Sequence, residues 1–414
     1  MSIDAPGMRD SQPIRTVAEA GSYVTRVCFK HGPPAKIGIE LEWLVIDPHD
    51  LDRRPDAQTL ATLLGPHAPT TLVPRSPALP LPHGGLVTVE PGGQLEISSL
   101  PAASATGLIT AMSADIQVLR ALLAPSGFEL SDLAADPYRQ PHRILKTPRY
   151  DAMAARFDEF GPAGRVMMCS TAAAQICLDL GTHAQAADRW RAAHQLGPVL
   201  LAAFANSPRT AGELVPAAAS TRMSSWWRLD PPRTLPPKST ALDSYVERVL
   251  DSQVLARRRE AGDWRLEQPL TLREWIESGE LLSTADIDLH LSMLFPPVRP
   301  QGYLEIRYLD AQPGDEWMAP LALLAALFAG PQSVQQVLRC CAEGADRWQE
   351  ATEHGLADPV LRAIAARLHD IAAPGLNGLR LPPAVRDKVD RVLRRRLCEA
   401  VSPALEELSA EGRP

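Results

Sequence analysis

The residues whose types and spacing could do chemistry are glutamates on short segments that read as β-strands. In residues 37–46 successive side chains alternate between two faces, so Glu40 and Glu42 share one face while apolar residues fill the other. Two carboxylates this close repel one another unless a metal ion or an arginine neutralises them. A half-exposed strand that turns its polar residues outward would give the same pattern, so one pair does not decide between the two interpretations.

The same design recurs in three later segments. Glu90 and Glu96 flank a Pro-Gly-Gly turn, Gln175 lies on the polar face of an otherwise apolar run, and Glu305 shares a face with Arg307. A solvent-facing sheet surface usually mixes Lys, Thr, Ser and Arg, whereas glutamates dominate here. We therefore predict a shared metal site with oxygen ligands. Its predicted ligands are Glu40, Glu42, Glu90, Glu96 and Glu305.

Composition narrows the class of protein. A net charge of −7 and a pI near 5.8 argue against nucleic acid as the main partner. The longest apolar run, residues 317–329, contains Pro320 and is too short to span a bilayer. No apolar signal segment opens the chain, and its six cysteines lack the paired spacing of a zinc site. We expect a cytoplasmic protein with reduced thiols, no membrane segment and no nucleic-acid partner.

The elements that must position these residues can be outlined in chain order. We expect a flexible tail at 1–12 and a single catalytic domain at 13–414, mostly helical over 317–409. Residues 51–82 read as a surface excursion, and the Arg- and Trp-rich residues 220–234 as a loop that could bind an anionic substrate. A basic stretch from Arg139 to Arg149 suits a phosphate-rich ligand or a solvated loop equally well. Helical spacing predicts helices at 14–29, 57–64, 105–123, 185–205, 243–257, 271–278 and 284–294.

Several nucleotide and hydrolase motifs are missing from the sequence. It has no Gly-x-Gly-x-x-Gly, no P-loop, no His-Glu-x-x-His and no Gly-x-Ser-x-Gly. Glutamates without paired cysteines favour Mg²⁺ or Mn²⁺ over zinc. Those ions mainly serve phosphoryl chemistry, in which arginines steady the phosphate oxygens. The residues alone therefore indicate Mg-dependent phosphoryl or nucleotidyl transfer.

Five motifs in order extend this interpretation. They are residues 38–42, 90–96, 204–208, 220–234 and 303–307. Together they resemble the glutamate–cysteine ligases of plants and actinobacteria, most closely the branch that serves ergothioneine biosynthesis. The resemblance implies an α+β fold like that of glutamine synthetase, with a curved antiparallel sheet of about six strands forming a funnel flanked by helices. A helical C-terminal layer would complete it.

The resemblance also implies roles for individual residues. Glu42, Glu90 and Glu96 would hold one Mg²⁺, and Glu40 and Glu305 a second near the ATP phosphates. Arg307 would contact the transferred phosphate, and Arg222 or Arg233 would contact phosphate or the glutamate α-carboxylate. The remaining expected cofactor-binding residues are Gln175, Asn206 and Arg149.

The implied reaction uses ATP, L-glutamate and L-cysteine as small-molecule substrates. The glutamate γ-carboxylate attacks the γ-phosphate of ATP, and the cysteine amine then displaces phosphate from the γ-glutamyl phosphate. Other carboxylate–amine ligases and guanidino kinases of the same fold remain open. So does a non-catalytic regulator that binds nucleotide or metal, although such a module has little use for a cluster of like charges.

Overall fold

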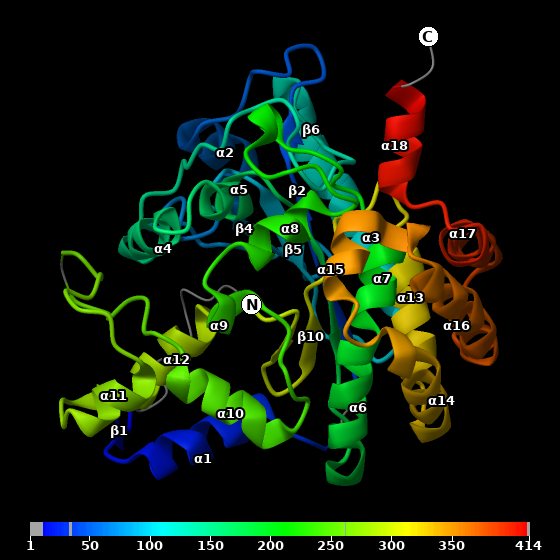
Figure 1. Cartoon of the computed structure of the whole chain (residues 1–414). Coiled ribbons are helices and arrows are strands. Elements are labelled where there is room, and N and C mark those ends of the chain that lie inside the picture. The colour runs from blue at the N-terminus through cyan, green and yellow to red at the C-terminus, as the bar shows by residue number, and fades with distance from the viewer. Residues whose placement is uncertain (1–10, 33–34, 261, 412–414) are drawn as a thin grey trace.

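A six-stranded antiparallel sheet forms the centre of the computed structural model, which describes residues 11–32, 35–260 and 262–411. The strand order is β4-β5-β2-β7-β10-β9, so strands far apart in the sequence lie side by side (Figure 1). The predicted six-stranded α+β fold is confirmed. Of the predicted tail, residues 1–10 lie outside the described residues. The strands are β4 (Leu86–Val89), β5 (Leu95–Ser98), β2 (Ile37–Trp43), β7 (Ala174–Leu178), β10 (Leu304–Ile306) and β9 (Val298–Pro300).

Alternation of side chains gives this sheet one apolar and one polar face. In β2 the apolar residues Ile39, Leu41 and Trp43 are buried in the main core, whereas Glu40 and Glu42 point the other way. The turn between β4 and β5 needs glycine at Gly92. A Cβ there would meet the Cys169 backbone at 2.3 Å. The turn is therefore packed closely enough to fix the positions of the two strands that carry the predicted glutamates.

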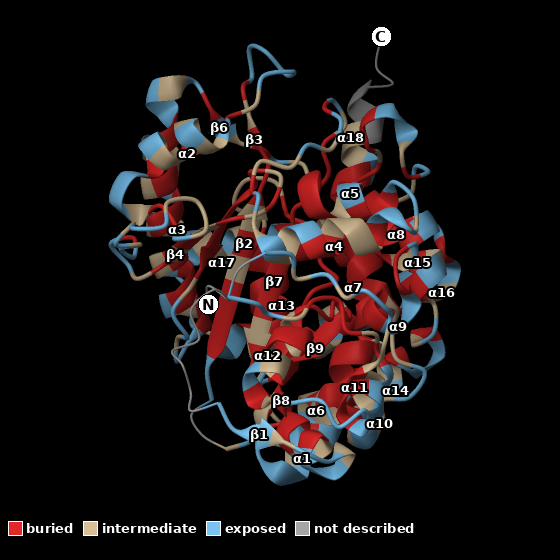
Figure 2. Cartoon of the chain, turned by 90° about the vertical axis from the view of Figure 1, so that its left-hand side faces the viewer, coloured by how far each residue is buried: buried red, intermediate tan, exposed pale blue. Residues whose placement is uncertain are grey.

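Helices cover both faces of the sheet. Figure 2 shows the strands and the inward sides of the helices buried, and the outward helix sides exposed. Elements before residue 300 supply α1 (Val17–Cys28), α2 (Ala57–Leu64), α3 (Ala105–Leu123), α4 (Pro148–Asp158), α5 (Ala163–Cys169), α6 (His183–Gln195), α7 (Gly197–Ala203), α10 (Leu242–Asp251), α11 (Leu272–Glu277) and α12 (Thr284–Ser292). Two small sheets pair β1 (Pro13–Ile14) with β8 (Leu282–Ser283) and β3 (Val45–Ile46) with β6 (Glu129–Leu130).

The C-terminal part is a helical layer, as predicted, on one side of the molecule in Figure 1. Its first helix, α13, is apolar all round and almost fully buried, because it packs between α3 and the later helices. The layer contains α13 (Met318–Leu327), α14 (Pro331–Cys341), α15 (Trp348–His354), α16 (Pro359–Gly378), α17 (Pro383–Leu393) and α18 (Pro403–Glu411).

One stretch differs from its prediction in a way that matters for the site. Residues 220–234 form two short buried helices, α8 (Thr221–Trp227) and α9 (Pro231–Thr234), rather than an open loop. The Ser220 side chain caps α8 by accepting a hydrogen bond from the Met223 backbone N–H. The predicted helix at 185–205 is divided into α6 and α7, with Pro198 in the first turn of α7.

Length and composition alone would let one helix in the described part of the chain, Ala105–Ser126, cross a membrane. A second candidate exists if the bent pair Met318–Leu327 and Pro331–Gly344 is counted as one span. The first candidate is not the apolar run that the sequence singled out. The first candidate contains α3, which contacts α13 and β2, and 39% of its apolar window is buried in this fold.

Candidate active site

Cross-strand pairing brings the predicted glutamates together on the polar face of the sheet. Glu96 on β5 lies directly opposite Glu42 on β2 and opposite Thr88 on β4. In the next row Glu40 lies opposite Gln175 on β7. Side chains in such positions have Cβ atoms about 4.5–5.5 Å apart. The register therefore forces three carboxylates from two strands into one small area.

A third row of the same face adds arginines. Glu305 on β10 lies opposite Cys177 on β7 and opposite Arg299 on β9. Arg307 follows the end of β10 and its guanidinium turns back over Glu305. The sheet thus carries acidic residues at its β4-β5-β2 side and an arginine-paired glutamate at its β10-β9 side.

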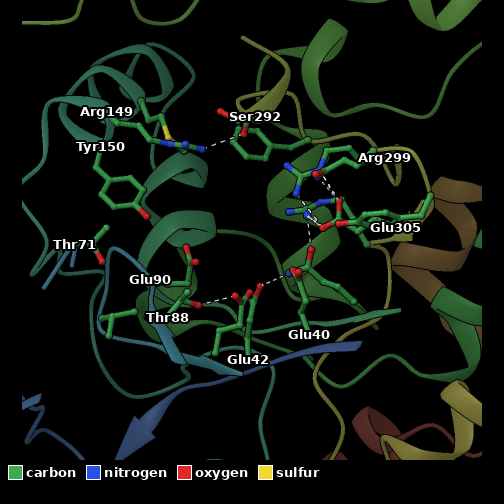
Figure 3. Close-up of a pocket in the computed structure, with 18 residues that line it drawn as sticks. Glu40, Glu42, Thr71, Thr88, Glu90, Arg149, Tyr150, Ser292, Arg299 and Glu305 are labelled. Carbon is green, nitrogen blue, oxygen red and sulfur yellow. Dashed lines mark hydrogen bonds and ion pairs between the residues drawn. The ribbon is translucent and has the colours of Figure 1, made fainter. Parts of the chain in front are cut away.

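These residues line one cavity, shown in Figure 3. Glu40, Glu42 and Glu90 point into it from the sheet, and Arg149 and Ser292 lie on the opposite wall. The cavity brings together eight of the eleven residues that the sequence predicts for the site. They are Glu40, Glu42, Glu90, Glu96, Glu305, Arg149, Gln175 and Arg307.

We call Glu42, Glu90 and Glu96 the acidic end of the cavity. Burial and the neighbouring carboxylates raise the pKa of Glu42 to about 7, of Glu90 to about 7 and of Glu96 to about 8. Burial and the charge of Glu305 also raise the pKa of Glu40, which stands between the two ends. A raised pKa means that the ionised carboxylate is destabilised, so binding of a cation or a proton is favoured.

Hydrogen bonds hold the carboxylates of the acidic end in place. Glu96 accepts a bond from the Thr88 hydroxyl at 2.6 Å, and Glu42 accepts bonds from Gln175 Nε2 at 2.7 Å and from the Ala173 N–H at 2.9 Å. Within the described residues no three His, Cys, Asp or Glu side chains are arranged as a preformed metal site. The carboxylate oxygens nevertheless suit a hard cation as ligands. They are buried close together, and a bound cation would relieve the repulsion between their charges.

We call Glu305, Arg299 and Arg307 the paired end. Arg299 donates two bonds to Glu305, at 2.5 Å from Nε and 2.9 Å from Nη2, and Arg307 Nη1 donates a third at 2.9 Å. Burial alone would raise the pKa of Glu305, but the two arginines hold it at about 2. This carboxylate is therefore ionised and already neutralised by its neighbours.

Gln175 connects the two ends. Its amide oxygen accepts a short bond from Arg307 Nη1, while its Nε2 donates to Glu42. The sequence places Gln175 among the expected cofactor-binding residues, not among the predicted metal ligands. In the structure the oxygen is instead occupied by Arg307, so Gln175 acts as a bridge between arginine and carboxylate.

Arg299 is a site residue that the sequence reading missed. It lies on an edge strand of three residues that ends in Pro300, and proline inside a run argues against a strand. The signal in the sequence was Gly302, a residue typical of tight turns, between Arg299 and Glu305. In the structure Gly302 forms this turn with a φ of +77°. A hairpin with that turn places the two residues opposite one another.

The basic stretch before α4 divides into structural and cavity-facing residues. Arg139 is buried against Asp136, and Arg143 pairs with Asp151 on α4 at 2.6 Å. Arg149, in the first turn of α4, lines the cavity and donates to the Ser292 carbonyl at 3.1 Å. Arg149 also lowers the pKa of Glu90, opposing the effect of burial.

Three predicted residues, Arg222, Arg233 and Asn206, are not among those lining the cavity. Arg233 is fully buried and donates to the carbonyls of Met293 and Gln253, both at 2.6 Å. Asn206 Nδ2 donates to carbonyls at 2.7 and 2.8 Å. Arg222 lies behind the sheet end, where it pairs with Asp310. Each of the three donates hydrogen bonds to backbone carbonyls and so helps to hold the backbone.

The chain belongs to the glutamate–cysteine ligase family 2, whose model matches residues 36–409. Glutamate–cysteine ligase EgtA of Mycobacterium tuberculosis is 35% identical over 377 residues, which are 88% of this chain and 84% of the relative. The chloroplastic glutamate–cysteine ligase of Arabidopsis thaliana is 28% identical over 312 residues, 70% of this chain and 59% of the plant protein.

Solved structures agree on the fold. A glutamate–cysteine ligase from Francisella tularensis, solved in complex with AMP, superposes with a TM-score of 0.55 at 13% identity over 93% of this chain and 86% of its own. A bifunctional glutathione synthetase from Pasteurella multocida superposes with a TM-score of 0.52 at 15% identity over 92% of this chain and 50% of its own. At these identities the likeness extends to the fold alone.

Proposed function

We propose that the protein joins the γ-carboxylate of L-glutamate to the amine of L-cysteine with ATP, giving γ-glutamylcysteine, ADP and phosphate for ergothioneine biosynthesis. The observation that carries this proposal is the single cavity in which a cluster of carboxylates with raised pKa faces an arginine-paired end. Formation of an acyl phosphate needs a cation site as well as arginines, because the attacking carboxylate and the phosphate groups are all anionic and must be neutralised. Membership of the family supports the choice of substrates.

The acidic end is the place where this chain would hold Mg²⁺, through Glu42, Glu90 and Glu96. Bound there, the ion would offset negative charge on phosphate oxygens, and Mn²⁺ could replace it. Glu40 would complete the set toward the paired end. Glu305 was predicted as a metal ligand, but its three bonds to arginine indicate a different task, which is to orient Arg299 and Arg307.

The paired end and the opposite wall would bind the anionic parts of the substrates. Arg307 lines the cavity, and its Nε–H is buried without a hydrogen-bond partner, so this arginine has a donor left for a phosphate oxygen. Arg149 stands across the cavity from the glutamates and would bind a second anionic group. The γ-carboxylate and the amine would react between these walls, where both are held close together.

The cellular setting follows from the substrates. ATP, glutamate and cysteine are intracellular metabolites, which fits the cytoplasmic location that the sequence predicts. The proposed partners are these three small molecules, with neither nucleic acid nor membrane involved.

The test is to identify the products. Purified protein is incubated with ATP, Mg²⁺, glutamate and cysteine, and in parallel with other amines or a guanidino compound in place of cysteine. Mass spectrometry should find γ-glutamylcysteine together with ADP in the reaction that contains cysteine. A γ-glutamyl product formed with another amine but not with cysteine would move the protein to the broader carboxylate–amine ligases. Phosphorylated guanidino product would indicate a kinase, and AMP with pyrophosphate would exclude the acyl phosphate route.

A further inference from the structure

Behind the cavity lies a buried hub centred on Asp310, which is only 1% exposed. Asp310 accepts hydrogen bonds from the hydroxyls of Ser207 at 2.6 Å and Ser220 at 3.0 Å, and from the Asn206 N–H at 2.8 Å. Arg222 Nη1 lies 3.4 Å from the same carboxylate. The hub gathers two motifs, residues 204–208 and 220–234, that the proposed catalytic chemistry does not use directly.

Arg222 connects this hub to the cavity. Its Nη2 donates to the main-chain carbonyl of Arg307 at 2.7 Å. Both guanidinium groups also lie over the Trp226 ring, whose centroid is 5.3 Å from Cζ of Arg222 and 5.5 Å from Cζ of Arg307. Both geometries are typical of cation–π contacts. Arg222 thus contacts Arg307 through the backbone and shares an aromatic neighbour with it.

Arg307 needs such support because of its place in the chain. Strand β10 ends at Ile306, so the main chain of Arg307 lies beyond the last regular sheet pair. Its N–H donates to the Pro297 carbonyl at 2.9 Å, and its carbonyl is the group that Arg222 holds. A buried carbonyl without a donor would be costly and free to reorient.

We propose that Asp310 and Arg222 are positioning residues that fix the backbone of Arg307, and that Arg222 reaches the reaction only through Arg307. The inference rests on the catalytic role that the proposed function gives to Arg307. Asp310 supplies the charge that keeps the Arg222 fork directed at the carbonyl. A guanidinium suits this role because its two terminal nitrogens lie in one fixed plane, so Nη1 faces the carboxylate while Nη2 donates to the carbonyl.

The test is a double-mutant cycle with Arg222→Lys and Arg307→Lys, measured as kcat and KM for each substrate. Lysine keeps the charge beside Asp310 but loses the planar fork, so Arg222→Lys should lower kcat by up to about a hundredfold while KM values change little. In the Arg307→Lys background the same change should cost almost nothing further.

A matched control is Arg139→Lys, which alters another buried arginine that pairs with an aspartate and donates to backbone carbonyls. It should lower the melting temperature and change kcat little, and whatever it changes should add to the effect of Arg307→Lys. Additive losses from Arg222→Lys and Arg307→Lys would overturn the proposal, because they would mean that Arg222 acts independently of Arg307.

Two further arms keep the test decisive. If Arg222→Lys does not fold, Ser220→Ala removes one donor to Asp310 and should give a smaller kcat loss with the same non-additivity; an additive loss again overturns the proposal. Product identity is scored separately in the wild type. If cysteine is not the acceptor, the proposed function is wrong. The double-mutant cycle can still be measured, as the rate of ADP release with the amine that does react.

Discussion

The two ends of the cavity use the same residue type on the same face of one sheet and give it opposite properties. At the acidic end the pKa of Glu96 is raised to about 8 by burial and by the charges of Glu40 and Glu42. At the paired end the pKa of Glu305 is about 2, because Arg299 and Arg307 outweigh the effect of burial. The difference lies in the neighbouring strand, which supplies arginine on one side and glutamate on the other.

The two ends differ in whether their carboxylates are available to a ligand. A neutralised group such as Glu305 has its oxygens engaged and contributes rigidity. A crowded group such as Glu96 retains unfavourable repulsion that a bound cation would relieve. Gln175 separates the two regimes, since it donates to Glu42 and accepts from Arg307. Binding capacity is therefore concentrated where the folded protein is least satisfied electrostatically.

The largest expected effect is loss of activity at the acidic end. Glu42→Gln keeps the shape of the side chain and removes its charge, so turnover should fall about a hundredfold or more and the Mg²⁺ requirement should rise. Glu40→Gln should behave similarly. The measurement is ADP release against Mg²⁺ concentration, with the exposed strand glutamate variant Glu129→Gln as control. Near-normal turnover at an unchanged Mg²⁺ requirement would remove these residues from the site.

The second effect is on stability and should have opposite signs at the two ends. In metal-free protein, Glu96→Gln relieves repulsion and should leave the melting temperature unchanged or higher. Glu305→Gln leaves Arg299 and Arg307 facing an uncharged group and should destabilise by up to ~3–5 kcal/mol, the range for breaking a buried ion pair. Thermal melts of both variants in EDTA test this. Equal shifts of the same sign would mean that the two ends do not differ as described.

A smaller effect is the pH dependence of the metal-free protein. For Glu96 the folded pKa, about 8, lies above its ordinary value of 4.5, so the unfolded chain loses its proton first as pH rises. The stability contributed by protonated Glu96 is present below pH 4.5 and is lost as pH rises to about 8. The free energy of unfolding should therefore decline over this window.

Melts from pH 5 to pH 8 in EDTA measure the decline, and Glu96→Gln should make it shallower, because the raised pKa values of Glu42 and Glu90, both about 7, account for the rest. Glu305→Gln should not flatten it, because a group with a pKa of about 2 does not titrate in this range. A wild-type slope that survives in Glu96→Gln would assign the decline to other groups.

Strand alternation allowed the sequence to predict which face of the sheet a residue occupies. Glu40, Glu42, Glu96 and Glu305 all lie on the polar face because a strand has a period of two residues. It could not predict which residues face each other across strands, since register depends on the whole sheet. For Arg299 the strand itself was missed, because it is short and ends in Pro300, so the pairing with Glu305 could not be predicted either.

Sequence reasoning was weakest for arginines outside regular strands. Residue type and motif suggested that Arg222, Arg233 and Arg307 all contact substrate, yet only Arg307 of these three lines the cavity. The other two are buried with their donors on carbonyls and carboxylates of distant segments. Arginine suits anionic substrates and buried backbone equally well, and only tertiary contacts distinguish the two uses.

The smallest expected effect concerns the cysteines, which tests whether the two ends suffice for the reaction. Burial raises the pKa of Cys28 and of Cys169 to about 12, so these thiols are poor nucleophiles. Cys340 is the sharpest case, because its hydrogen bond with Cys341 lowers its pKa to about 7. It lies on α14 and does not line the cavity.

Cys340→Ser should therefore leave kcat and every KM unchanged, as should Cys398→Ser at the exposed position. The buried variants Cys28→Ser, Cys169→Ser and Cys341→Ser should lower the melting temperature, because each buries a hydroxyl in an apolar site at a cost of about 1–3 kcal/mol. Turnover per folded molecule, with folding followed by circular dichroism, separates the two outcomes. A folded Cys340→Ser protein with little turnover would require a protein thiol in the reaction, and the carboxylates and arginines of the two ends would then not account for it alone.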